Sequence, residues 1–153
     1  MRPIALLLFL SALFAGACHK SLSAEEQLKS DVEKIEKYLS DKGLTAQKTD
    51  SGLHYIITKE GTGGSPTVSS TIKIQYKGYL LDGTVFDATL SGQTLSFLLS
   101  ELIQGWKEGI PLMKKGGKST FFIPSGLGYG SQDKGAIPAN SVLIFEITLV
   151  DYQ

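Results

Sequence analysis

Cysteine, histidine and tryptophan are scarce in this 153-residue sequence, which holds one cysteine, two histidines and one tryptophan. The cysteine has no disulfide partner, and His19 and His54 lie too far apart in the sequence to suggest a metal site. No charge of one sign prevails, because fifteen basic and fifteen acidic residues give a net charge of zero. This balance argues against a nucleic-acid partner. The length suits one domain with a hydrophobic core better than two.

A long membrane-spanning run is also missing, since the apolar stretch near the N-terminus covers only residues 4–14. It follows a single arginine and ends in small residues before Cys18, as in a secretion signal. Ala-Gly-Ala-Cys resembles a bacterial lipobox, although Ala15 stands where leucine is more common. We predict a signal peptide over 1–17, lipid attachment at Cys18, and an exported, membrane-anchored bacterial lipoprotein that faces the periplasm or the cell surface. The alternative is an ordinary signal peptide that leaves a free Cys18 thiol.

An amphipathic helix is predicted over residues 24–42. Ser23 and Glu26 have the spacing of a capping box, and Gly43 supplies a stop. Its apolar residues recur every three or four positions, at Leu28, Val32, Ile35 and Leu39. The helix is either a spacer that packs on its own domain or a surface for homodimer formation, and the run is too short to decide. Residues 18–51 are expected to form a lipid-anchored helix and linker.

Alternating apolar residues indicate β-strands in the rest of the chain. They occur within residues 53–59, 72–88, 94–99, 118–124 and 141–152. Asp82-Gly83 favours a hairpin turn. Only the run from Glu101 to Met113 has helical spacing among these segments. The pattern predicts an α+β fold, a mostly antiparallel sheet with one helix on one face.

The predicted helix from Glu101 to Met113 contains two glycines and the only tryptophan. Gly105 and Gly109 each weaken a helix by up to about 1 kcal/mol relative to alanine. Since they are four residues apart, they lie on one face and allow another backbone or side chain to come close. Trp106 points about 100° away from that face. From spacing alone, it is most simply a core residue.

Five motifs, in order along the chain, resemble those of the FKBP family of peptidyl-prolyl cis/trans isomerases. They are Tyr-x-Gly-x-Leu, Asp-Gly-x-x-Phe-Asp, Ile-x-Gly-Trp-x-Glu-Gly, Tyr-Gly and Ile-Pro, within YKGYLLDGTVFDAT, LIQGWKEGIPLMKKGGK, GLGYG and AIPANSVLIFEITL. The resemblance covers residues 52–153, which we expect to be the isomerase domain. It implies a half-open antiparallel sheet wrapped around one short α-helix, preceded here by the amphipathic helix.

The reaction implied by the resemblance is rotation about an X-Pro amide, which is opposed by a barrier of about 18–20 kcal/mol. No bond breaks, so neither a nucleophile nor a metal nor a cofactor is required. An apolar pocket disfavours the charge-separated planar form of the amide, and fixed donors can hold the twisted form. The partners implied are proline-containing polypeptides, with macrolide immunophilin ligands as a further class.

The resemblance also assigns pocket residues position by position. The aromatic walls and floor would be Tyr76, Phe86, Trp106, Tyr129 and Phe145, and the aliphatic lining Leu102, Ile103 and Ile137. Asp87 is expected as a buried carboxylate near the twisting carbonyl, with the Tyr129 hydroxyl and the Ile103 amide as donors. From pattern alone, Tyr76 and Phe145 are more simply plain core positions, because both lie on regular alternating strands, and Asp87 is equally consistent with a turn. Because no assigned residue lies in 24–42, we expect that helix to be dispensable for turnover.

Several positions depart from the family pattern. Leu95 stands where several members have an aromatic residue, Ala88 and Thr89 where serines are common, and Ser100 where glycine is usual. One wall of the pocket is therefore expected to be less aromatic, which bears on peptide preference and macrolide affinity. The alternatives to an isomerase are a non-catalytic module that holds a proline segment and a structural lipoprotein that keeps only the fold.

Overall fold

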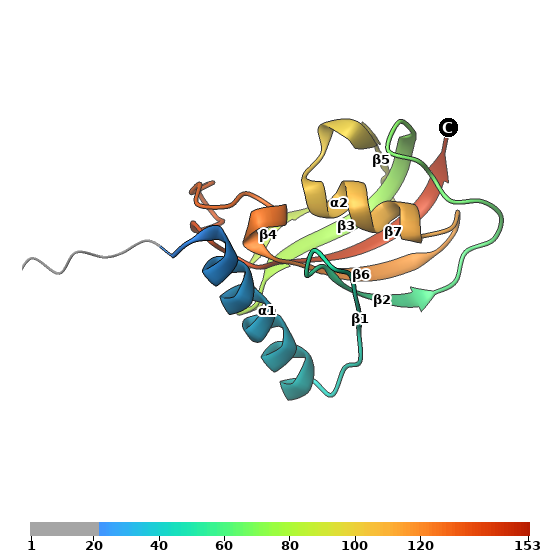
Figure 1. The fold of residues 1–153 in the computed structure, drawn as a ribbon. Coiled ribbons are helices and arrows are strands. Elements are labelled where there is room, and N and C mark those ends of the chain that lie inside the picture. Colours follow the sequence, from blue (N-terminus) through green and yellow to red (C-terminus); the bar gives the residue numbers. More distant parts are fainter. Residues whose placement is uncertain (1–21) are drawn as a thin grey trace, which may run out of the picture.

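The computed structural model describes residues 22–153, so the predicted signal peptide and Cys18 lie outside the described residues. The strands form one seven-stranded sheet, with helices on both of its faces (Figure 1). The α-helices are α1 (Ala24–Asp41) and α2 (Gln104–Gly109). The strands are β1 (Gln47–Lys48), β2 (His54–Lys59), β3 (Thr71–Leu80), β4 (Val85–Ala88), β5 (Leu95–Leu98), β6 (Lys118–Ile123) and β7 (Leu143–Tyr152). Short 3₁₀ helices are η1 (Leu99–Glu101), η2 (Ile110–Leu112) and η3 (Ser125–Leu127).

The sheet is antiparallel, with the strand order β1-β2-β6-β7-β3-β4, and β5 also pairs with β3. The two longest strands, β3 and β7, lie side by side, with Tyr76 opposite Ile147 and Gly78 opposite Phe145. Alternation places one set of their side chains toward α2 and the other set toward α1 or solvent. The predicted α+β fold, an open antiparallel sheet around a short helix, is confirmed.

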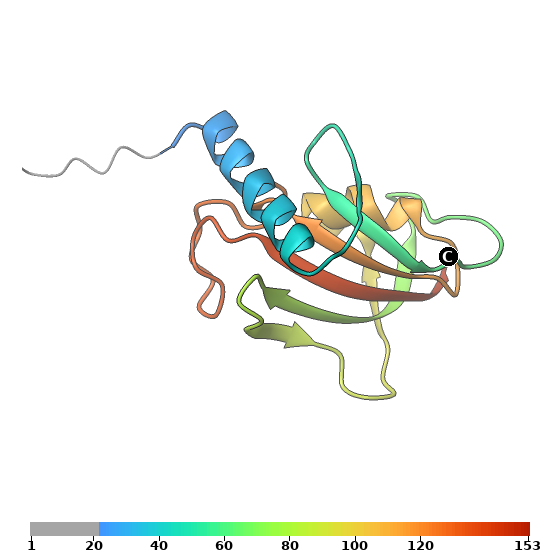
Figure 2. The same ribbon diagram turned by 90° about the horizontal axis from the view of Figure 1, so that it is seen from below.

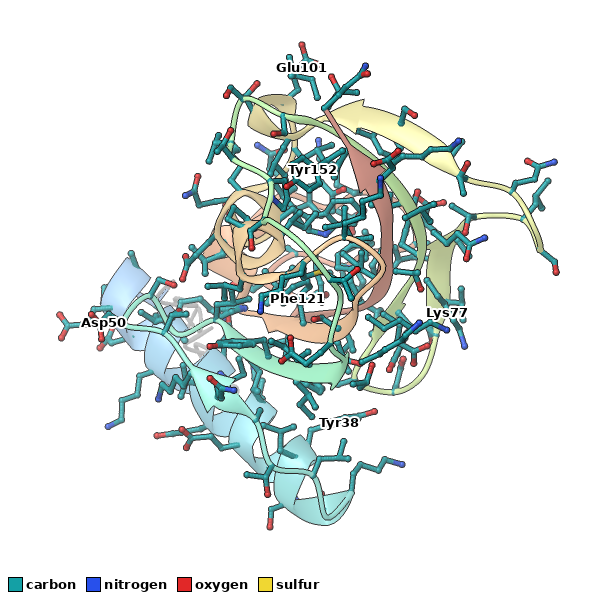
Figure 3. All side chains as sticks on the ribbon, turned by 90° about the vertical axis from the view of Figure 1, so that its right-hand side faces the viewer. Tyr38, Asp50, Lys77, Glu101, Phe121 and Tyr152 are labelled. Atoms are coloured by element: carbon teal, nitrogen blue, oxygen red, sulfur yellow. The ribbon has the colours of Figure 1, made fainter. Side chains whose placement is uncertain are left out.

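The main hydrophobic core lies between α2 and the sheet. Ile74, Phe121 and Leu149 are fully buried there, and Trp106 of α2 is 5% exposed. Figure 3 shows the packed side chains of this region, with Phe121 labelled inside it. The core positions the helix α2 against β6.

The helix α2 is shorter than the predicted run from Glu101 to Met113. Ile103 has extended backbone angles, and the α-helix begins after it, at Gln104. At the other end, Pro111 lies in the first turn of η2. Proline has no N–H to continue the α-helical ladder, so the chain tightens into a 3₁₀ turn.

The two glycines of α2 allow the close approach that their spacing predicted. A Cβ on Gly105 would lie 2.6 Å from Ile123 Cγ2, and one on Gly109 would lie 2.7 Å from Phe121 Cε1. Both partners are fully buried side chains of β6. Gly105 and Gly109 therefore weaken α2 as a helix but let it lie directly on the strand.

The helix α1 lies on the opposite face of the sheet from α2, as Figure 2 shows. The predicted capping box is present, with the Ser23 hydroxyl accepting from the Glu26 amide and the Glu26 carboxylate from the Ser23 amide. Ile35 and Leu39 are buried in a second cluster with Phe122, Val142 and Ile144. Much of the apolar stripe is thus covered by the chain's own sheet. None of the helices within 22–153 is long and apolar enough to cross a bilayer.

Candidate functional site

A concave pocket of about 470 Å³ opens between α2, the sheet and the loop that joins β6 to β7. All nine residues assigned to the site from the sequence line it: Tyr76, Phe86, Asp87, Leu102, Ile103, Trp106, Tyr129, Ile137 and Phe145. They come from six separate segments of the chain. The sheet and α2 therefore bring together residues that are up to 69 positions apart, from Tyr76 to Phe145. Their chemical roles remain predictions.

Aromatic rings packed edge to face form the floor of the pocket. The Trp106 and Phe145 centroids are 5.0 Å apart at 88°, and those of Tyr76 and Trp106 are 5.3 Å apart at 80°. Phe86 packs on Phe145 at 5.4 Å and 79°. This geometry is favoured because the positive edge of one ring meets the negative face of the other. The rings hold one another in place, so the floor is formed before any ligand binds.

Gly78 makes room for two of these rings. It lies on β3 opposite Phe145, and a Cβ at this position would be 2.5 Å from Phe86 Cε2 and 2.7 Å from Phe145 Cε1. Such distances are well inside ordinary van der Waals contact. The glycine of the Tyr-x-Gly-x-Leu motif is therefore a packing requirement of the pocket.

The indole N–H of Trp106 is buried and makes no hydrogen bond within the described part of the chain. Ile103, which precedes α2, has no side-chain cap and stands at the pocket with extended backbone angles. Tyr129, in the loop between β6 and β7, is half-buried and also lines the pocket. The polar groups at this pocket are thus few and lie among apolar side chains, which is typical of small-ligand sites.

Asp87 and Tyr76 are joined by a hydrogen bond of 2.5 Å from the Tyr76 hydroxyl to Oδ2 of Asp87. Burial, then this bond to the carboxylate, raises the pKa of Tyr76. The expectation that Asp87 itself is buried is wrong, because the residue is exposed. Its strand, β4, is at the edge of the sheet and pairs with β3 alone, so one side of Asp87 is open to solvent.

Two residues of the lining were not predicted from the sequence, Phe97 and Lys134. Phe97 packs on Tyr76 at a centroid distance of 6.4 Å, whereas Leu95 is 41% exposed and is not part of the lining. The segment β5 therefore contributes one aromatic ring to the lining, from Phe97 and not from position 95. Alternation along residues 95–99 puts Phe97 on the same face as Leu99, which is buried, and this pattern could have identified Phe97 from the sequence. For Lys134, in a loop without periodicity, no such signal exists.

A second depression, of about 570 Å³, lies on the opposite face of the sheet. Its lining is largely polar and includes Gln75, Lys77, Thr120, Glu146 and Thr148. These are outward-facing side chains of an open sheet, without the clustered apolar surface of a ligand pocket. We therefore take the aromatic pocket as the candidate site.

Comparison with known proteins identifies the family of this chain. Residues 63–150 match the family of FKBP-type peptidyl-prolyl cis-trans isomerases. A relative from Aeromonas hydrophila, the FKBP-type peptidyl-prolyl cis-trans isomerase FkpA, is 41% identical over 130 residues, which are 83% of this chain and 48% of the relative. A probable FkpA from Neisseria meningitidis is 43% identical over 126 residues, 80% of this chain and 46% of the relative. The chain spans about half the length of these curated relatives.

Solved structures agree with these matches. The crystal structure of FkpA from Escherichia coli has a TM-score of 0.74 and 38% identity, covering 85% of this chain and 61% of that one. The crystal structure of a peptidyl-prolyl cis-trans isomerase from Pseudomonas syringae has a TM-score of 0.73 and 27% identity, covering 87% of this chain and 98% of that one. The chain belongs to the family of FKBP-type peptidyl-prolyl cis-trans isomerases.

Proposed function

We propose that this protein is a peptidyl-prolyl cis-trans isomerase that accelerates rotation about X-Pro bonds in exported proteins. The observation that supports it is the preformed aromatic floor, in which Trp106 packs edge to face against Tyr76 and Phe145. A proline ring set on this floor would place the preceding amide among apolar side chains. There the planar, charge-separated form loses solvation relative to the twisted form, and the barrier falls.

A few polar groups at the pocket would orient the twisted amide. The Tyr129 hydroxyl and the Ile103 amide are the proposed donors to the peptide, and the Asp87 carboxylate would lie near the twisting carbonyl. The hydrogen bond from Tyr76 fixes that carboxylate against the wall. These donors add specificity to the apolar effect, because they favour one geometry of the bound chain. No step requires a proton to change place.

The alternative is a non-catalytic module that holds a proline segment of a partner. Binding and turnover can be separated with one proline-containing peptide. Binding is followed by the fluorescence of Trp106, the chain's only tryptophan, and turnover by NMR exchange between the cis and trans peptide. An isomerase gives both signals. A fluorescence response without faster exchange would support the binding module and contradict the isomerase.

We further propose that Cys18 carries a lipid and anchors the protein to a membrane, facing the periplasm or the cell surface. The support is the short apolar run followed by Ala-Gly-Ala-Cys. Detergent partitioning of the native protein should change to the aqueous phase in Cys18→Ala. An intact mass with an unmodified thiol would contradict the proposal. Macrolide immunophilin ligands are proposed as ligands of the aromatic pocket. A homodimer through residues 24–42 is also proposed, and it would have to use residues of α1 that the sheet leaves uncovered.

A further inference from the structure

Asp31 of α1 is a fully buried carboxylate far from the aromatic floor in sequence. Its Oδ2 accepts hydrogen bonds from the Ser125 amide at 2.9 Å and the Ser125 hydroxyl at 2.5 Å. Its Oδ1 accepts from Gln27 Nε2 at 2.8 Å and from Lys34 Nζ at 3.2 Å. A buried charge is tolerated only when it is paired and hydrogen-bonded, and Asp31 meets both conditions. The bonds to Ser125 tie α1 to a segment 94 residues further along the chain.

Ser125 begins η3 and is itself the anchor of the loop that bears Tyr129. Its carbonyl oxygen accepts from the Gly128 amide at 2.9 Å and from the Gly130 amide at 2.8 Å. These two residues flank Tyr129 on either side. A shift of Ser125 would therefore move both backbone supports of Tyr129 together.

The helix that presents Asp31 is held in place independently of this contact. Ile35 and Leu39 are buried against the outer face of the sheet. Toward its N-terminal end, Leu28 and Val32 pack over Gly52, where a Cβ would lie 2.9 Å from Leu28 Cδ1. Asp31 thus projects from a fixed element into η3, which lies against α1.

We infer that Asp31 is a positioning residue for Tyr129, acting through Ser125, and that α1 is in this way a part of the isomerase site. The inference rests on the proposed isomerase function and extends it. It replaces the expectation that residues 24–42 are dispensable for turnover. Tyr129 touches the substrate in the proposed mechanism, whereas Asp31 acts only by fixing the loop. Small displacements of a positioned group reduce rates strongly, so the effect is measurable.

The test compares four variants of the full chain in detergent: Asp31→Ala, Asp31→Asn, Ser125→Ala and the control Leu39→Ala. Leu39 is 6% exposed at the far end of α1 and belongs to the second cluster. Its replacement weakens α1 packing without touching Ser125. All are assayed by cis–trans exchange of one proline peptide at a temperature where circular dichroism shows them folded.

We expect kcat/KM of Asp31→Ala to fall by about fivefold or more, mostly in kcat. Asp31→Asn should lose less kcat/KM, because its amide oxygen can still accept from the Ser125 amide. If Asp31→Ala does not fold, Asp31→Asn alone tests the positioning role. Leu39→Ala should lower Tm and leave kcat/KM unchanged. In a Tyr129→Phe background, Asp31→Ala should have a smaller effect than alone. The inference would be overturned by an unchanged kcat/KM in folded Asp31→Ala and Asp31→Asn. It would also be overturned if the losses from Asp31→Ala and Tyr129→Phe were additive, or if Leu39→Ala lost as much kcat/KM as Asp31→Ala.

The NMR resonances of the Tyr129 ring supply a measurement that does not depend on turnover. They should shift in Asp31→Ala and Ser125→Ala and remain in place in Leu39→Ala. A wild-type chain without catalysed exchange would contradict the proposed function alone, and the ring resonances would then decide whether Asp31 positions Tyr129. Unshifted resonances in both variants would contradict the positioning role.

Discussion

The Tyr76 hydroxyl and the Asp87 carboxylate are joined at 2.5 Å across the wall of the aromatic pocket. The bond links a central strand, β3, to the edge strand β4, and both residues line the pocket. Burial and then this bond raise the pKa of Tyr76 further above its ordinary value, so the hydroxyl is protonated and donates at neutral pH. The pair therefore presents one fixed carboxylate, with Tyr76 as the donor that orients it.

Replacing Asp87 by asparagine tests whether the negative charge of this pair, and not only its shape, contributes to turnover. Asp87→Asn keeps the size and an acceptor oxygen but removes the negative charge, and we expect kcat/KM to fall by about tenfold, equivalent to about 1.4 kcal/mol. Tyr76→Phe is the matched control, since it keeps the ring and the charge and should lose less. Exchange rates on one peptide measure both. A larger loss in Tyr76→Phe would show that the bond, and not the charge, matters.

Activity should be nearly flat from about pH 6 to 8, because no group at the pocket is proposed to change protonation during turnover. His54, the histidine within the described residues, lies outside the pocket and near Glu36 of α1. The pH profile of kcat/KM measures this, with His54→Gln as the control. A steep change centred near pH 6.5 that survives in His54→Gln would contradict it.

Stability, in contrast to activity, should depend on His54. Burial lowers the pKa of His54 below its usual value of about 6.5, despite its bond to the Gly52 carbonyl at 2.9 Å. The unfolded chain then binds more protons in mildly acid solution, so this contribution is present above about pH 6.5 and is lost as pH falls below it. Denaturant unfolding of the wild type and His54→Gln should diverge between about pH 7 and 5. If the unfolding free energies of the two proteins changed in parallel with pH, the lowered pKa of His54 would be contradicted.

Alanine at Gly105 or Gly109 should destabilise the fold even though alanine is the better helix former. The new Cβ would lie 2.6 Å from Ile123 or 2.7 Å from Phe121, both fully buried, and overpacking of this kind costs about 1–3 kcal/mol. Gly126→Ala is the control, because no atom lies within 4 Å of a Cβ there. Urea unfolding gives the free energies. A neutral or stabilising Gly105→Ala would show that α2 can move away from β6.

Most of the candidate site could be predicted because its residues lie in motifs or on regular strands. The spacing of Gly105 and Gly109 indicated close approach, and the alternation of β3 and β7 placed Tyr76 and Phe145 on one face. The exposure of Asp87 could not be inferred, because it depends on β4 being an edge strand. Strand order is set by tertiary pairing, which local patterns do not encode.

The role proposed for α1 was also beyond the sequence pattern. Asp31 is three residues after Leu28 and four before Ile35, so it borders the apolar stripe, whereas Glu33 is exposed. The pattern nevertheless names no partner for the Asp31 carboxylate. Only the fold brings Ser125 to it, across 94 residues. The apolar stripe of α1 predicted a packing face but could not choose between the chain's own sheet and a second copy.

The central claim is that an apolar aromatic pocket accelerates rotation about an X-Pro bond, and proline-limited refolding of a model protein tests it most directly. Unaided isomerisation takes about tens to hundreds of seconds, so acceleration by the wild type is readily measured. Tyr129→Phe removes a donor but keeps the ring and should lose about tenfold at most. Folded Trp106→Ala or Phe145→Ala opens the floor to water and should lose more. A wild type without acceleration, or a Tyr129→Phe worse than folded Trp106→Ala, would contradict the account.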